Sequence, residues 1–496
     1  MRKQQPEDPG SLPASDKSQE ATGGRGLFTS ANVGLVIGPA LFVLFLFLPI
    51  SGLTTAAKGV VGLAVWMAIW WFTEAIPIAG TSLLPLIIYP FLGPSELNGV
   101  EASYADSVIL LFLGTLLLAR AISRSGVDER VALHLLKLLG GNSHRLVAGF
   151  MIACASLSAW ISATATTVIM LPVALAVVAT VEDEEQRARL GKCLVLAVVY
   201  AATLGVLSTI IATPPNAVFA DISPALLGFE VGFGQWMLVG VPMAAIGLVL
   251  CWVYLVYIVA PIRDVSLEEG SRVVEERLQA RGPITRDERM VGIVFVLTVV
   301  AWVSRSLFWG ELLPNVSNMT ISLLSAVVLF LLPSENGGRL LDWETAVKLP
   351  WSVLLLIAGG LALAYGFGAL GIDVWIANGL DFLGTLPAVV AVAIMAAITI
   401  AVAEVMSNAA TAALLIPIAA PLAEAVGVSP LQLTMAVTLA ASFGFTLPVA
   451  SPSNAVALST GQITTTQLAK AGLPMNLLGV ILVTIAVYTI VPLIFG

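Results

Sequence analysis

The sequence predicts an all-α polytopic membrane protein, and three observations support this prediction. Of the 496 residues, 58% are hydrophobic and only 11% are charged, and the mean hydropathy is +0.97. A soluble domain needs roughly a quarter of its residues charged to cover its surface. Apolar runs of about twenty residues recur along the chain, and this is the length at which a helix crosses the hydrocarbon layer. Because backbone groups in lipid must be bonded internally, such runs indicate helices rather than open sheet.

Changes in composition divide the chain into six segments. The start is rich in Pro, Ser, Gly, Glu and Lys and contains no apolar run, which is typical of a disordered tail. The polar loop at 261–289 alternates Glu with Arg and is expected to form a solvated amphipathic helix. The expected segments are the tail at 1–30, first membrane helices forming a scaffold at 31–106, a first repeat at 107–232, linking spans with the polar loop at 233–350, a second repeat at 351–470 and a last membrane helix at 471–496.

Within the first membrane helices, a carboxylate and several prolines mark the ends of apolar runs. Glu74 follows the aromatic run Trp70-Trp71-Phe72 and is interpreted as an interfacial residue or a helix cap. Pro77, Pro85 and Pro90 are expected to bend the apolar segment that follows, because proline interrupts a helix.

Two short polar turns lie inside strongly apolar sequence. The first is Ser162-Ala163-Thr164, and the second, Ser407-Asn408-Ala409, follows it by 245 positions. Thr166 and Thr411 keep this separation. The apolar stretch 146–181 is too long for one crossing and has polar residues in its middle. We therefore expect two re-entrant helical hairpins, with their tips at 162–164 and 407–409.

Each turn is followed by a proline-containing break in a later apolar run. Thr213-Pro214-Pro215-Asn216 is the first, and Ser451-Pro452-Ser453-Asn454 is its counterpart 238 positions later. Proline lacks the backbone donor that a helix needs, so both segments are expected to be broken helices. At membrane depth such irregular backbone is tolerated only where it lines a cavity or is buried in protein.

Positive charge distinguishes the two repeats. Residues 120–192 contain eight Lys or Arg, whereas the matching residues 365–437 contain none. The positive-inside rule places the open end of the first hairpin at the cytoplasm and that of the second at the other face. The halves are therefore expected to be inverted repeats, an arrangement typical of secondary transporters. We expect an integral multi-pass protein of a cytoplasmic (inner) membrane, with its N-terminus in the cytoplasm.

The polar turns offer the groups that a small anion needs. Neither hairpin contains a buried Lys or Arg, but both offer hydroxyls and the amino ends of helices, where backbone N–H groups favour negative charge. Thr164, Asn408 and Ser451 are suitable donors, and carbonyls freed at the breaks suit a small hard cation such as sodium. The alternative for one such turn is a Ser/Thr patch that joins neighbouring helices. Two copies at a fixed offset favour a binding site.

Other ionisable residues support different hypotheses. Glu404 precedes the second turn and is either a proton relay or a buried carboxylate bonded to nearby hydroxyls or backbone. The cysteines and histidines show no metal-ligand or catalytic spacing, so no enzyme activity is expected. A passive anion channel of the same fold is a further alternative. The formal net charge of −8 says little about partners, because the charges lie in loops and tails, and no nucleic-acid partner is expected.

Several of these motifs resemble the divalent anion/sodium symporter family. The resemblance lies in residues 70–77, 111–130 and 351–377, in the two serine turns and in the first break, and it extends from about residue 30 to the end. It implies a scaffold and a moving transport domain that works by an elevator motion, a homodimer in membrane lipid, and coupling to sodium ions. The implied substrates are small dianions, above all C4-dicarboxylates, with sulfate or tricarboxylates such as citrate as alternatives.

The resemblance also implies the residues of the site. The first sodium site would use Ser158, Ser162, Ala163 and Gly205. The second would use Asn408 and the carbonyls near Ala403, Met406 and Ala450. Substrate would contact Ser162, Thr164, Ser407, Asn408, Ser451 and Pro452.

The motifs depart from the family pattern at four positions. Ala163 stands where the family has asparagine, Ala409 where it has threonine, Val206 where it has glycine, and Ser453 where it has proline. With Ala163 the first sodium site lacks one side-chain ligand. Sodium-independent dicarboxylate exchange is therefore the alternative to sodium symport.

Overall fold

The computed structural model describes residues 30–139, 142–229, 231–262, 268–310, 312–379, 386–448 and 450–495. In these ranges the chain consists of helices and the segments that connect them, and it forms no β-strand. Eight of the described helices are long and apolar enough to cross a membrane, judged by length and composition. The predicted all-α polytopic membrane fold is thereby confirmed. The predicted disordered tail lies, except for Ser30, outside the described residues.

The helices follow one another with short connections in both halves. The first half forms α1 (Ser30–Phe47), α2 (Thr55–Thr73), α3 (Ile78–Thr81), α4 (Leu84–Leu92), α5 (Ser107–Ser125), α6 (Val127–Leu139), α7 (Ser143–Ser158), α8 (Ala163–Val178), α9 (Glu184–Gly205), α10 (Pro214–Leu227) and α11 (Phe233–Tyr254). The remainder forms α12 (Glu268–Ala280), α13 (Arg286–Ser304), α14 (Asn318–Leu331), α15 (Trp343–Ala346), α16 (Trp351–Ala369), α17 (Ile372–Gly379), α18 (Ala388–Val405), α19 (Asn408–Ala425), α20 (Pro430–Ala441), α21 (Pro452–Ser459) and α22 (Thr465–Phe495).

The first membrane helices end where the sequence changes. Glu74 closes α2 in the left-handed conformation, with a φ of 47°, in agreement with its interpretation as a helix cap. The proline-containing segment after it divides into α3 and α4, because Pro77 and Pro85 lie at the two helix starts. Tyr89 on α4 donates a hydrogen bond to the carbonyl of Ala362 at 2.9 Å and so ties α4 to α16.

The polar link between the halves contains the expected amphipathic helix, which is α12. The next helix, α13, begins inside the predicted polar loop, because Thr285 and Glu288 form a capping box that starts it early. The link is joined to α6 by ion pairs. Lys137 pairs with Glu275 at 2.8 Å, and buried Arg130 pairs with Glu288 at 2.9 Å.

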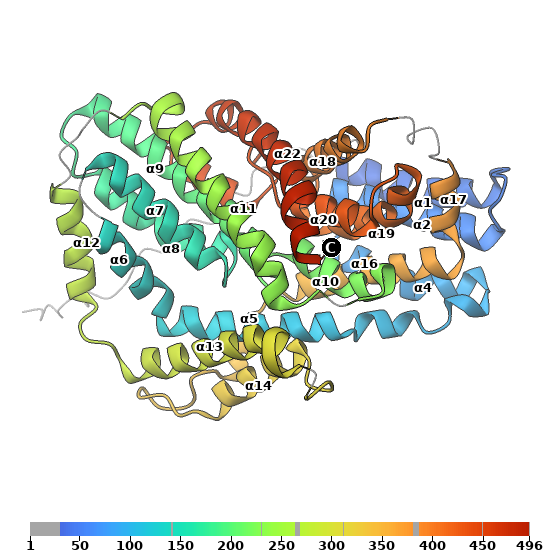
Figure 1. Cartoon of the computed structure of the whole chain (residues 1–496), viewed down its shortest axis with the longest axis horizontal. Coiled ribbons are helices and arrows are strands. Elements are labelled where there is room, and N and C mark those ends of the chain that lie inside the picture. Colours follow the sequence, from blue (N-terminus) through green and yellow to red (C-terminus); the bar gives the residue numbers. More distant parts are fainter. Residues whose placement is uncertain are drawn as a thin grey trace, which may run out of the picture.

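The two hairpins lie toward opposite ends of the molecule. In Figure 1, α7 and α8 are on the left, and α18 and α19 are on the right. Helix α5 runs along the long axis and packs against α13 and α14. At the right end α1 pairs with α2, and α2 and α4 contact α16. This arrangement agrees with two repeats, whereas the entry of the hairpins into a membrane stays a prediction.

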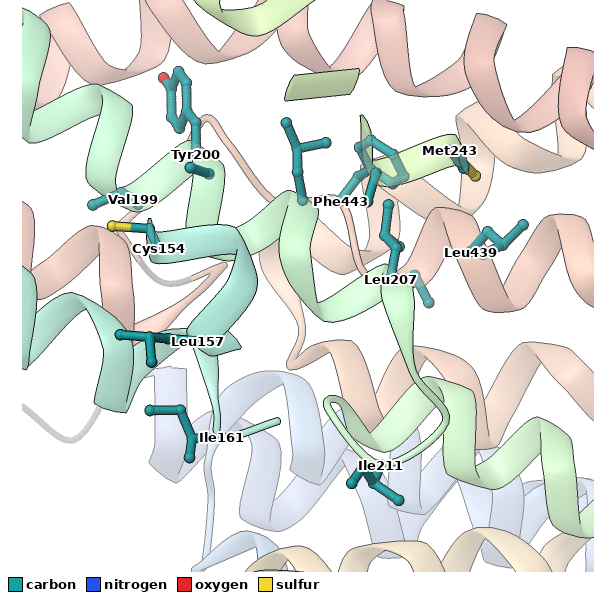
Figure 2. Packing of buried hydrophobic residues seen from close by; sticks show 14 of the residues in the cluster. Cys154, Leu157, Ile161, Val199, Tyr200, Leu207, Ile211, Met243, Leu439 and Phe443 are labelled. Atoms are coloured by element: carbon teal, nitrogen blue, oxygen red, sulfur yellow. The ribbon is translucent and has the colours of Figure 1, made fainter. Parts of the chain in front are cut away.

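Each broken helix extends from its own repeat to the hairpin of the other. Helix α10, beyond the first break, packs against α19 and α20, and α21, beyond the second break, packs against α8 and α9. Tyr200 of α9 packs edge-on against Phe445, with ring centroids 4.9 Å apart. This reciprocal packing unites hairpins and breaks in one core. Figure 2 shows some of its buried side chains, including Leu157, Ile161, Leu207, Ile211, Leu439 and Phe443.

Candidate functional site

The two predicted turns have the same hydrogen bonds. Ser162 caps α8 by accepting from the backbone N–H of Ala165 at 3.2 Å. Ser407 caps α19 by accepting from the N–H of Ala410, also at 3.2 Å. Because each serine is the cap, the helix begins at the next residue, and the predicted tips include the first turn of the returning helix.

At the starts of α8 and α19, backbone N–H groups point toward the turns. The serine caps occupy the third N–H of α8 and α19, so the first two N–H groups of each helix have no acceptor within the helix. The aligned peptide dipoles add partial positive charge at the same ends. No Lys or Arg lies in residues 146–186 or 349–469. Within these two ranges, the helix starts are therefore groups that can attract an anion.

The predicted substrate residues reach the surface, whereas most of the predicted sodium residues are buried. A surface position suits an anion that arrives from water, and a buried position suits a cation that has lost its water shell. The accessible residues are Ser162, Thr164, Ser407, Asn408, Ser451 and Pro452. The buried residues are Ser158, Gly205, Ala403, Met406 and Ala450.

The two helix breaks are closed by equivalent asparagines. Asn216 Nδ2 donates to the carbonyls of Val206 and Thr209, at 3.0 and 2.8 Å. Asn454 Nδ2 makes the same bonds to the carbonyls ten and seven positions before it, those of Gly444 and Leu447, at 3.0 and 2.9 Å. The breaks therefore share one geometry, in which Val206 matches Gly444.

One contact joins each hairpin to its own break, and the two contacts differ in charge. In the first repeat, Thr209 Oγ1 donates to the carbonyl of Ala159 at 2.5 Å. In the second, Glu404 stands at the position that matches Ala159. Its carboxylate accepts from the backbone N–H groups of Thr446 and Leu447, both at 2.8 Å. The second junction is therefore held by a charge and the first by a neutral hydrogen bond.

The surroundings of Glu404 distinguish between its two interpretations. The side chain is buried, and besides the two backbone groups it accepts a hydrogen bond from Asn476 Nδ2 of α22. Three donors therefore surround the carboxylate, as expected for a buried acceptor bonded to the backbone. The contact with Asn476 could not be foreseen, since α22 carries none of the motifs.

Two oxygen atoms lie close to Gly444, which has no side chain. A Cβ placed on Gly444 would lie 3.7 Å from both Asn408 Oδ1 and the carbonyl oxygen of Ala450. Asn408 Oδ1 is buried and has no hydrogen-bond partner among the described residues. Small hard cations take amide and backbone carbonyl oxygens as ligands. This group contains two of the predicted second-site residues, and its oxygens are of the kinds that such cations take as ligands.

The predicted first sodium site is organised differently. Ser158 and Gly205 meet, because a Cβ on Gly205 would collide with Ser158 Oγ and with the backbone of Ala155. Ser158 Oγ donates to the carbonyl of Ala155 at 3.3 Å. Ala163 contributes no side-chain oxygen. The two oxygens beside Gly205, Ser158 Oγ and the carbonyl oxygen of Ala155, are therefore already bonded to each other, whereas Asn408 Oδ1 has no hydrogen-bond partner among the described residues.

Three residues of this geometry were not anticipated from the sequence: Thr209, Gly444 and Asn476. Gly444 could have been found from the sequence, because aligning Asn216 with Asn454 places Gly444 at the position of Val206. The hydrogen bonds of Thr209 and Asn476 depend on how separate helices pack, which a single sequence does not encode locally.

Paired hairpins and broken helices in an all-helical membrane fold define the class as that of secondary transporters. Residues 29–495 match the family model described as the sodium:sulfate symporter transmembrane region. The chain belongs to this family. The predictions of divalent anion/sodium symporter membership and of a transporter rather than an enzyme are confirmed.

Individual relatives cover nearly the whole chain. The sodium-dependent dicarboxylate transporter SdcS of Staphylococcus saprophyticus is 38% identical over 481 residues, covering 94% of this chain and 92% of that protein. SdcS of Staphylococcus aureus USA300 is 36% identical with the same coverage. The solved Alcanivorax borkumensis YdaH transporter has a TM-score of 0.57 at 14% identity, covering 86% of this chain and 96% of that one. Neisseria gonorrhoeae MtrF has a TM-score of 0.55 at 13% identity, covering 94% and 95%. These two structures are similar in fold alone.

Proposed function

We propose that this chain is a secondary transporter that couples the movement of C4-dicarboxylates to sodium ions by alternating access. The observation that carries the proposal is the buried Oδ1 of Asn408 at the capped start of α19, which has no hydrogen-bond partner among the residues that the structure describes. The near full-length similarity to the SdcS relatives, named sodium-dependent dicarboxylate transporters, supports the choice of substrate and ion.

Asn408 connects the two ligands. An amide side chain carries an acceptor oxygen and a donor nitrogen, so Oδ1 can bind the cation while Nδ2 donates to a substrate carboxylate. Thr164 and Ser451 supply further donors. Because no Lys or Arg neutralises the dianion here, the bound cation does so, and each ligand raises the affinity for the other.

The remaining residues complete the proposed sites. Substrate also contacts Ser162, Ser407 and Pro452, and the cation site at Asn408 draws on Ala403, Met406 and Ala450. The hairpins and breaks form the moving domain of an elevator, in a homodimer within the cytoplasmic membrane. The positive charge of residues 120–192 supports a cytoplasmic N-terminus and a first hairpin that opens to the cytoplasm.

Sodium-independent exchange is the second candidate, and one observation favours it. Ala163 removes a side-chain ligand from the first predicted sodium site, which weakens any coupling that depends on both sites.

Uptake of labelled succinate into proteoliposomes, with and without an inward sodium gradient, tests the proposal. Symport predicts uptake that requires sodium. Equal uptake without sodium, accelerated by internal dicarboxylate, would establish exchange instead. Entry of sulfate but of no dicarboxylate would overturn the substrate class, and a lack of trans-stimulation would indicate a passive channel.

A further inference from the structure

The two helix breaks can be compared residue by residue, because their asparagines bond to carbonyls at the same distances in sequence. Asn216 and Asn454 each hold the carbonyls ten and seven positions earlier. This register matches Val206 with Gly444. The hairpin register, in which Ser162 matches Ser407, pairs Ala163 with Asn408. The two repeats therefore differ at both positions that face the candidate cation group.

In the second repeat one of these positions has no side chain and the other supplies an amide oxygen. Gly444 has no side chain, and the place of its missing Cβ lies 3.7 Å from both Asn408 Oδ1 and the carbonyl oxygen of Ala450. The same point lies 3.1 Å from Ala450 Cβ, so the space is narrow. Asn408 Oδ1 is buried without a hydrogen-bond partner in the described part of the chain. A buried amide oxygen without a donor is unfavourable unless a cation or water occupies the space.

In the first repeat the corresponding positions are hydrocarbon. Val206 places an isopropyl group where Gly444 has a hydrogen, and it is only 5% exposed. Ala163 has a methyl group where Asn408 has an amide. The two differences are complementary, because one removes the oxygen ligand and the other adds carbon volume. A desolvated cation is poorly held by such a surface.

We propose that this transporter has a single cation site, in the second repeat, and that Val206 and Ala163 close its counterpart in the first. The inference rests on the proposed function and specifies its coupling. A dianion that travels with one sodium ion carries one net negative charge, whereas two sodium ions would make the complex neutral. The number of sites therefore determines whether the membrane potential acts on transport.

The number of sites can be measured without transport. Equilibrium binding of ²²Na⁺ to the purified full-length protein is expected to give one ion per protomer. Two ions per protomer would overturn the inference, whatever the substrate proves to be. Absence of succinate uptake together with one bound sodium ion would instead overturn the proposed substrate and leave the single site supported.

Variants at Ala163, Val206 and Gly444 test this assignment. The double variant Ala163→Asn/Val206→Gly is expected to bind a second ²²Na⁺ and to raise the Hill coefficient for sodium from about 1 to about 2. Ala163→Asn alone adds the oxygen without the space, and Val206→Gly alone adds the space without the oxygen, so neither single variant should gain an ion. Gly444→Val is the mirror change and is expected to abolish the wild-type site. Sodium binding retained in Gly444→Val, in protein that elutes as the native species, would contradict the proposal.

Transport under a clamped potential supplies an independent test. In proteoliposomes with potassium and valinomycin, an inside-positive potential is expected to accelerate sodium-dependent succinate uptake by the wild type. Uptake that is insensitive to potential, with two ²²Na⁺ ions entering per succinate, would refute the single site.

Discussion

Replacement of Glu404 by glutamine tests whether charge holds the second hairpin to its helix break. The carboxylate accepts from the N–H groups of Thr446 and Leu447 at 2.8 Å and from Asn476 Nδ2. Glutamine keeps one acceptor oxygen and turns the other into a donor, so one backbone N–H faces an NH2 group. The loss of one hydrogen bond to a charged group amounts to about 1.5–3 kcal/mol, and a buried unsatisfied donor adds about 1–3 kcal/mol.

The first repeat provides a matched control for this substitution. Thr209→Val removes the neutral hydrogen bond to the carbonyl of Ala159, at the junction that corresponds to Glu404. A neutral hydrogen bond contributes about 0.5–1.5 kcal/mol, so Thr209→Val should destabilise the protein less than Glu404→Gln. Thermal unfolding of both variants in detergent, without sodium or substrate, measures the difference. Sodium is left out because an ion that binds only the native state would raise the melting temperature of each variant unequally.

Two results would contradict the structural role of the Glu404 carboxylate. If Glu404→Gln and Thr209→Val lower the melting temperature equally, the charge at the second junction contributes nothing to its stability. If Glu404→Gln keeps the wild-type melting temperature but shifts the pH profile of succinate uptake, the proton-relay interpretation of Glu404 is correct.

Three further predictions concern Asn408, the asparagines of the two breaks, and the ion pair between Arg130 and Glu288. Asn408→Ala should abolish sodium-dependent succinate uptake while the protein remains folded, because it removes both the cation ligand and the substrate donor; wild-type uptake in that variant would exclude Asn408 from the site. Asn216→Ala and Asn454→Ala should each destabilise the protein by about 1–3 kcal/mol in chemical unfolding, since two carbonyls lose their donor in either case; a large effect in only one would contradict the common geometry of the breaks. Arg130→Met should destabilise the protein by about 3–5 kcal/mol because Glu288 is left buried with one partner fewer, and Arg130→Met/Glu288→Met should recover part of that loss; no recovery would mean that Arg130 acts through its carbonyl contacts.

Local chemistry explains which parts of the site could be predicted from the sequence. Serine caps and prolines at helix starts act within a few residues, so the turn at Ser162 and the break before Asn216 are visible in the sequence itself. Because the cap precedes the helix, the tips predicted at 162–164 and 407–409 extend into α8 and α19. The overlap of the predicted tips with the first turns of these helices therefore has a local cause.

Contacts between distant helices could not be predicted in this way. Glu404 and Asn476 are 72 positions apart and meet only because α18 packs against α22. Tyr89 reaches Ala362 across 273 positions. The sequence allowed two interpretations of Glu404, a proton relay or a buried carboxylate bonded to nearby hydroxyls or backbone, because it does not show which groups surround the side chain. Only the structure distinguishes the two interpretations, because it shows that the second break passes Glu404 and supplies the N–H groups of Thr446 and Leu447.

A single cation site would make the direction of net transport depend on the membrane potential. A dianion with one sodium ion carries one net negative charge, and moving it against an inside-negative potential requires about 2.3 kcal/mol per 100 mV. A tenfold sodium gradient contributes only about 1.4 kcal/mol per ion. At about 100 mV the potential therefore outweighs the gradient, and the transporter would release dicarboxylate or exchange it rather than accumulate it. Reopening the first site with Ala163→Asn/Val206→Gly would reverse that balance, because a neutral complex does not respond to the potential and two ions contribute about 2.8 kcal/mol. Concentrative succinate uptake by the wild type at that potential and gradient would therefore refute coupling to one ion.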